Sequence, residues 1–132
     1  MVLRGKRYKK EKKTVLGTLR NALNGIVYTY SVEINFKIHL LVAVLVLLFS
    51  YILELSKMEV IVCILLIGLV LAFELINTVV EMIVDMVEPH EDPLAGMIKD
   101  ASSGAVLVIA VTSAVIGLII FIPKLYMLFV WY

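Results

Sequence analysis

The feature that most constrains the fold is an apolar run that begins at Val60, stays uncharged to Phe73 and then continues into a polar stripe. A helix needs about 20 apolar residues to cross the hydrocarbon core of a bilayer, and this run alone is shorter. The helix must therefore carry Glu74 at the far boundary of the membrane or inside it. An acid in that position costs about 2.5–3.5 kcal/mol even on the gentler insertion scales, so it indicates a functional site.

The polar stripe extends from Glu74 to Asp85 and occupies one side of the predicted helix. At about 100° per residue, its polar members fall within one arc, whereas the opposite side is aliphatic. These members are Glu74, Asn77, Thr78, Glu81 and Asp85. A helix whose last turns emerge into water and carry solvated acids is the alternative interpretation. Three carboxylates and an amide on a single stripe favour a site over solvated acids.

The composition identifies a membrane protein. Of the 132 residues, 62% are hydrophobic, and the mean hydropathy is +1.04, whereas soluble domains are about 45–50% apolar. The length allows a single domain. The predicted transmembrane helices are residues 34–53, 60–85 and 93–122. Asp92 and Pro93 form a favourable helix start, with Asp92 as the N-cap, and we expect Pro123 to end the last span.

Three segments flank these spans. Residues 14–32 repeat apolar residues in steps of three and four, which predicts an amphipathic helix lying in the membrane interface. Residues 1–13 are basic, and we expect a mobile cytoplasmic arm that contacts anionic lipid rather than nucleic acid. Residues 123–132 form an aromatic tail suited to the outer interface. The predicted fold is an all-α membrane protein with an N-terminal surface helix and three transmembrane helices.

With the amino end in the cytoplasm, three crossings gather the polar residues of all helices at the cytoplasmic boundary. Glu33 and Glu81 are suited to share a divalent cation, since Mg²⁺ typically takes one or two carboxylates and phosphate oxygens. Lys99, followed by Asp100, supplies a compact positive charge for phosphate. Glu74 lies deeper, where partial desolvation would make it a better proton acceptor. Phosphoryl transfer requires mainly positioning and charge neutralisation, and this set supplies both.

The residues alone leave other functions open. The chain contains neither G-x-x-x-x-G-K-[ST] nor G-x-G-x-x-G, so no familiar phosphate cradle indicates ATP. One rival is a small cation- or proton-coupled transporter that uses Glu74 and Glu81 as relay sites. Another is a non-catalytic assembly subunit. Lys99 and Asp100 beside the stripe favour a kinase, because neither rival needs a phosphate partner there. The acidic loop at residues 86–92 contains Glu88, His90, Glu91 and Asp92. These four suggest a metal site, but clustered acids in a loop are more often solvated.

Two strings resemble a known family. Glu74-x-x-Asn77-Thr78-x-x-Glu81-x-x-x-Asp85, followed by Lys99-Asp100-x-x-Ser103, is similar to the signature of the bacterial integral-membrane diacylglycerol kinase and undecaprenol kinase family. The earlier Glu33-x-Asn35-Phe36-x-Ile38-His39 resembles the form of the first polar segment in the undecaprenol kinase branch. The resemblance covers about residues 14–122.

This resemblance implies an ATP- and Mg²⁺-dependent lipid kinase of the bacterial cytoplasmic membrane, with its active site on the cytoplasmic side. The protein would be a homotrimer with active sites shared between neighbours. Its substrate would be undecaprenol or diacylglycerol, giving undecaprenyl phosphate or phosphatidic acid. His39 favours undecaprenol. Gly96 departs from the pattern of the undecaprenol kinase branch, whereas Asn21 and Asn24 depart from that of the diacylglycerol kinase branch. The identity of the lipid substrate therefore stays open.

The resemblance also implies residue roles. Glu74 would be the catalytic base, and Glu33 and Glu81 would bind the metal. The nucleotide contacts would come from Glu33, Asn77, Glu81, His90, Glu91, Asp92, Lys99 and Asp100. The lipid contacts would come from Phe36, Lys37, Ile38, His39, Leu40, Glu74 and Ser103.

Overall fold

The structure is a computed structural model that describes residues 14–130, and within that range it consists of four helices. They are α1 (Val15–Val32), α2 (Ile34–Ile52), α3 (Lys57–Val87) and α4 (Pro93–Val130). The basic arm predicted at residues 1–13, and Trp131 and Tyr132 of the aromatic tail, lie outside the described residues. The predicted all-α class is confirmed.

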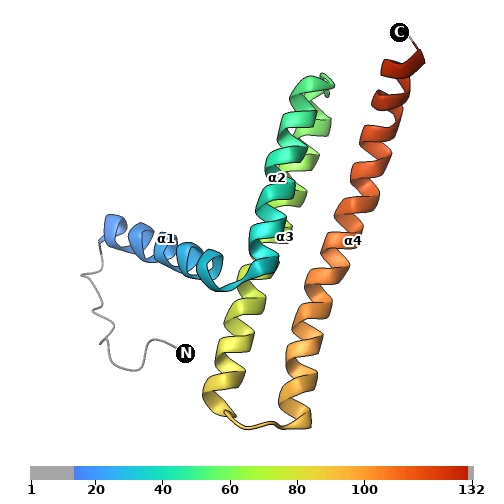
Figure 1. The fold of residues 1–132 in the computed structure, drawn as a ribbon. Coiled ribbons are helices and arrows are strands. Elements are labelled where there is room, and N and C mark those ends of the chain that lie inside the picture. Colours follow the sequence, from blue (N-terminus) through green and yellow to red (C-terminus); the bar gives the residue numbers. More distant parts are fainter. Residues whose placement is uncertain (1–13, 131–132) are drawn as a thin grey trace.

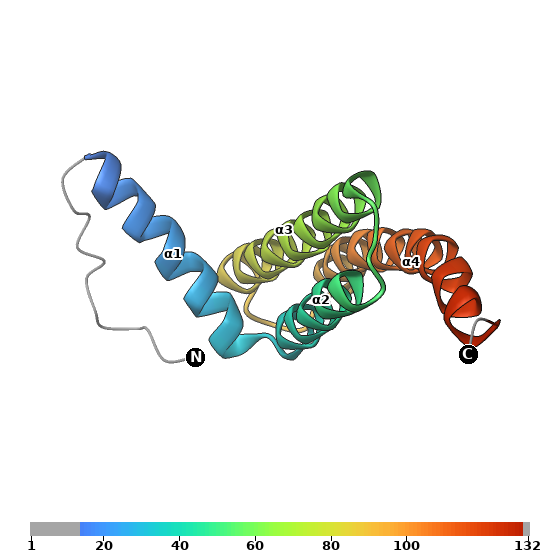
Figure 2. The ribbon, with the colours of Figure 1, turned by 90° about the horizontal axis from the view of Figure 1, so that it is seen from above.

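Three of these helices form a bundle. α2, α3 and α4 are each long and apolar enough to cross a membrane, which agrees with the predicted number of spans. They run side by side, and α3 and α4 pack against each other most extensively (Figures 1 and 2). Most of their apolar side chains remain exposed on the single chain. Such outward-facing apolar surface is expected of helices that a bilayer surrounds.

The first helix projects sideways from this bundle. Figure 1 shows α1 leaving the start of α2 at a steep angle, and Figure 2 shows its far end pointing away from the other helices. Its apolar side chains are exposed, including Val15 at 90% and Leu16 at 77%. An exposed apolar face on a helix that lies across the bundle fits the predicted surface helix.

The chain turns at Glu33, between α1 and α2. Glu33 is extended, with φ of −100° and ψ of 119°, and its backbone N–H closes α1 on the carbonyl of Thr29 at 2.8 Å. Figure 1 shows this corner against the middle of α3, so that the last turns of α3 and the first turns of α4 continue beyond the level of α1. If α1 marks the membrane surface, the polar stripe of α3 lies at that surface and beyond it.

Side-chain caps fix where the long helices begin. The Asp92 carboxylate accepts the backbone N–H groups of Leu94 at 2.8 Å and Ala95 at 3.0 Å. The prediction that Asp92 caps the last helix is therefore confirmed. At the opposite end of the bundle, Ser56 and Glu59 form a reciprocal capping box at the start of α3.

One prediction about the last span is wrong. α4 does not end at Pro123 but continues to Val130 with the proline inside the helix. A proline removes one backbone hydrogen bond and kinks a helix, but membrane helices tolerate it. A Cβ atom on Gly104 or Gly117 would meet nothing within 4 Å, so neither glycine is needed for packing within one chain.

Candidate active site

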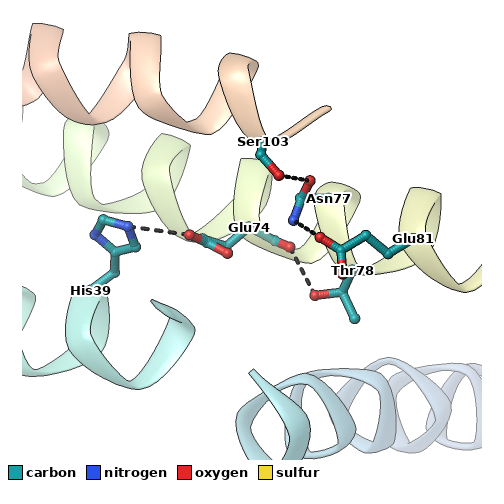
Figure 3. Close-up of polar contacts among 6 residues, drawn as sticks. All are labelled: His39, Glu74, Asn77, Thr78, Glu81 and Ser103. Atoms are coloured by element: carbon teal, nitrogen blue, oxygen red, sulfur yellow. Dashed lines mark hydrogen bonds and ion pairs between the residues drawn. The ribbon is translucent and has the colours of Figure 1, made fainter. Parts of the chain in front are cut away.

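Glu74 is the most deeply buried carboxylate of the described residues, with 2% of its surface exposed. It lies on the side of α3 that packs against α2, where Phe36, His39 and Ala43 form one helical face. His39 reaches across, and its Nε2 lies 3.3 Å from Glu74 Oε1 (Figure 3). A buried carboxylate requires a partner of this kind, because desolvation of an unpaired charge is costly.

A row of hydrogen bonds continues along α3 from Glu74 towards the α3–α4 loop. The Thr78 hydroxyl donates to the Glu74 backbone carbonyl at 3.0 Å. Asn77 donates through Nδ2 to Glu81 Oε1 at 2.9 Å, and its Oδ1 accepts from Ser103 Oγ on α4 at 3.4 Å (Figure 3). Asn77 therefore joins the carboxylate of Glu81 to the neighbouring helix, and it orients that carboxylate.

Glu33 and Glu81, the predicted metal ligands, lie close enough for their charges to interact. Burial, and secondarily the negative charge of Glu81, raise the pKa of the Glu33 carboxyl above its ordinary value. Two carboxylates that repel each other in this way form a site of negative charge that favours a divalent cation. Among residues 14–130 no group of three or more acidic, histidine or cysteine side chains could enclose a metal. The pair of Glu33 and Glu81 therefore fits a cation that keeps other ligands.

Lys99 is held on the same side of the bundle. Its ammonium forms an ion pair with Asp85, which lies one turn beyond Glu81 on α3. Both residues border an open cavity of about 600 Å³ beneath the α3–α4 loop. The predicted nucleotide residues His90, Glu91 and Asp92 also line it. The structure thereby groups four of the predicted nucleotide contacts, whereas Asp100 is exposed and lines none of the cavities described here.

The segment predicted to contact lipid divides between two sides of α2. Ile38 and His39 line an apolar cavity of about 550 Å³ between α2, α3 and α4. Phe36 and Leu40 border another, of about 360 Å³, beneath α1. The Lys37 ammonium lies 5.5 Å from the centre of the Tyr30 ring on α1. Glu74 itself lines neither cavity, and His39 links the first cavity to it through the 3.3 Å contact with its carboxylate.

Some contacts of the site were not assigned from the sequence. The sequence places Asp85 and Thr78 on the stripe but assigns a role to neither. The signal for Asp85 was its position four residues after Glu81, on the same helical face. Its pairing with Lys99 depends on how α3 and α4 align, which the sequence pattern does not specify.

Comparisons with known proteins agree with this geometry. A family model described as prokaryotic diacylglycerol kinase matches residues 20–121. An undecaprenol kinase from Bacillus subtilis is 45% identical over 80% of this chain and 85% of its own length. A diacylglycerol kinase from Synechocystis is 34% identical over 88% of this chain and 67% of its own length.

Proposed function

Because this chain belongs to the prokaryotic diacylglycerol kinase family and is an ATP-using, multi-pass membrane lipid kinase, we propose that its lipid substrate is undecaprenol. The higher identity to an undecaprenol kinase than to a diacylglycerol kinase supports this choice. The apolar cavity beside His39 supports it too, because a polyprenyl alcohol has one apolar chain to accommodate. Diacylglycerol is the alternative substrate that the assay must test.

The observation that carries the mechanism is the buried carboxylate of Glu74. It contacts His39, which lines the apolar cavity, and the charges of Glu33 and Glu81, which form a polar rim, reach it. In the transfer step, the lipid hydroxyl oxygen forms a bond to the γ-phosphorus of ATP. The bond from that phosphorus to the β–γ bridging oxygen breaks, and ADP leaves. The hydroxyl proton passes to Glu74. General base catalysis of this kind contributes about 10²–10⁴-fold to a rate.

Glu33 and Glu81 are the residues that would hold Mg²⁺, together with phosphate oxygens of the nucleotide. When bound, the ion neutralises negative charge that accumulates on the phosphates. Asn77 donates to Glu81 Oε1 and so orients the carboxylate that would help to hold the cation. Lys99 exchanges Asp85 for a phosphate oxygen when the nucleotide enters. His90, Glu91, Asp92 and Asp100 complete the nucleotide contacts around the loop.

The same proposal includes orientation and assembly. The amino end, the Glu33 corner and the α3–α4 loop face the cytoplasm, where ATP is available. The protein is a homotrimer whose active sites are shared between neighbours, as the family resemblance implies. The apolar face of α1 is exposed, and few residues of α4 are buried within one chain. Both helices therefore have apolar surface that neighbouring chains or lipid can cover. Light scattering of the purified protein in detergent tests the trimer, and labelling of single cysteines in intact cells tests the orientation.

The central experiment compares two glutamate-to-glutamine variants in mixed micelles with labelled ATP. Glu74→Gln should lower phosphate transfer to undecaprenol by at least about a hundredfold, with unchanged assembly. Glu54→Gln is the matched control, because this glutamate is exposed in the turn at the opposite end of the bundle. Normal transfer by Glu74→Gln would show that another group accepts the proton. Faster turnover of diacylglycerol than of undecaprenol by the wild-type protein would overturn the choice of lipid.

A further inference from the structure

His39 is the only side chain of another helix, within residues 14–130, that makes an ion pair with Glu74. We propose that His39 is a positioning residue that fixes the Glu74 carboxylate for proton transfer from the lipid. This inference rests on the proposed role of Glu74 as the proton acceptor. It assigns to His39 a role in the chemical step, beyond contact with the lipid.

The contact with His39 holds one carboxylate oxygen of Glu74 and does not involve the second oxygen. His39 Nε2 lies 3.3 Å from Glu74 Oε1, whereas Oε2 makes no hydrogen bond to any described residue. When Nε2 carries hydrogen, it donates to Oε1 and holds the carboxyl group against α2. A glutamate side chain has three rotatable bonds, and ordering such a chain before reaction removes that entropic cost from the transition state.

The surrounding charges define the direction of this effect. Glu33 and Glu81 are the acidic groups whose charges reach Glu74, and both repel its carboxylate. His39 is the group that attracts it. Without His39, repulsion from the polar rim would act unopposed, and the carboxylate would lose the interaction that directs it to α2.

The position of His39 also connects Glu74 to the lipid. His39 borders the apolar cavity between α2, α3 and α4, together with Ile38, Ala43 and Val70. Its side chain is 24% exposed, and that of Glu74 is 3% exposed. A lipid chain in this cavity ends beside the imidazole, so its hydroxyl arrives next to the carboxylate that the imidazole holds. Proton acceptor and lipid hydroxyl therefore meet in one fixed geometry.

The test uses two substitutions at His39 and one matched control. His39→Leu removes the donor and should lower kcat by about tenfold to a hundredfold, with the KM for ATP unchanged. His39→Gln keeps a donor at nearly the position of Nε2 and should restore most of kcat. Thr112→Val is the control, because this exposed threonine donates only to a carbonyl of its own helix at 2.8 Å.

A double-mutant cycle separates positioning from a structural effect. If His39 acts through Glu74, His39→Leu should have no further effect on the residual rate of Glu74→Gln. An equal fold-loss in both backgrounds would overturn the proposal. So would a loss in His39→Leu that appears only in the KM for the lipid, or a failure of His39→Gln to restore kcat. If wild-type protein transfers no phosphate to any lipid alcohol, the proposed function fails. Normal kcat in His39→Leu refutes this inference alone.

Discussion

Asn77 provides the sharpest test of how the metal site is built. Its amide is 6% exposed, donates to Glu81 Oε1 at 2.9 Å and accepts from Ser103 Oγ at 3.4 Å. Asn77→Leu keeps nearly the same volume and removes both bonds. Glu81 then loses the donor that orients it, so that its second oxygen no longer has a fixed direction.

The size of the effect follows from the shorter bond. A hydrogen bond to a charged group is worth about 1.5–3 kcal/mol, which corresponds to about a 10- to 150-fold change in an equilibrium constant. Residues that orient metal ligands typically change affinity by about 10–100-fold when they are substituted. The Mg²⁺ concentration for half-maximal activity should therefore rise by about tenfold to a hundredfold in Asn77→Leu.

The assay is a Mg²⁺ titration of phosphate transfer at fixed ATP and lipid. Thr78→Val is a suitable neighbour for comparison, since its hydroxyl contacts the Glu74 backbone and not Glu81. Its Mg²⁺ requirement should change less than that of Asn77→Leu. An Mg²⁺ curve for Asn77→Leu that overlays the wild-type curve would show that metal binding by Glu81 does not depend on the amide of Asn77.

Three further predictions concern the polar rim and the opposite end of the bundle. Lys99→Met should raise the KM for ATP about tenfold to a hundredfold in an ATP titration, because one charge-assisted contact to phosphate is lost; an unchanged KM contradicts it. Burial and a neighbouring charge raise the pKa of Glu33, so its contribution to stability is present below about pH 4.5 and lost as the pH rises through the raised pKa. Glu33→Gln without divalent cations should then melt at a higher temperature than wild type at neutral pH, and the difference should vanish on acidification; an equal difference at both pH values contradicts it. Lys124→Met breaks the 3.4 Å pair with Glu59 and should change neither the free energy of unfolding appreciably nor kcat, because solvent screens an exposed ion pair; denaturant titration and the transfer assay measure both.

The helices and one face of the site could be predicted from the sequence because both depend on local rules. An apolar backbone in a bilayer must satisfy its hydrogen bonds internally, so long apolar runs become helices. Helical periodicity then places Glu74, Asn77 and Glu81 on one side of α3, as the structure shows. The Asp92 cap is equally local, because it involves residues adjacent along the chain.

The contacts between helices could not be predicted in the same way. The bond between Ser103 and Asn77 depends on the height at which α4 passes α3, and the pair of His39 and Glu74 depends on the height at which α2 passes it. A sequence pattern gives the face of each helix but not these offsets. The division of the segment around Phe36 between two cavities has the same origin, since it is set by where α1 leaves the bundle.

The prediction that Pro123 ends the last helix failed for a related reason. Proline disrupts one local hydrogen bond, but the turns beyond it are stabilised by contacts that the local rule does not include. Lys124 Nζ reaches Glu59 Oε2 at the start of α3, 3.4 Å away, and thus links the turn after Pro123 to another helix.

One continuous helix allows the protein to bring together two substrates of opposite solubility. Glu74 and Glu81 lie two turns apart on α3, a separation along the axis of about 10 Å. On the side of Glu74, the apolar cavity beside His39 opens between membrane helices. Towards the loop, Glu33 lies near Glu81, and one turn beyond Glu81 the Asp85 carboxylate pairs with Lys99 of α4. An apolar lipid alcohol and a charged nucleotide can therefore approach along the same helix from opposite directions. The alcohol stays in the membrane and the nucleotide stays in water. This arrangement requires Glu74 to lie at the end of an apolar run, although that position is costly for a carboxylate.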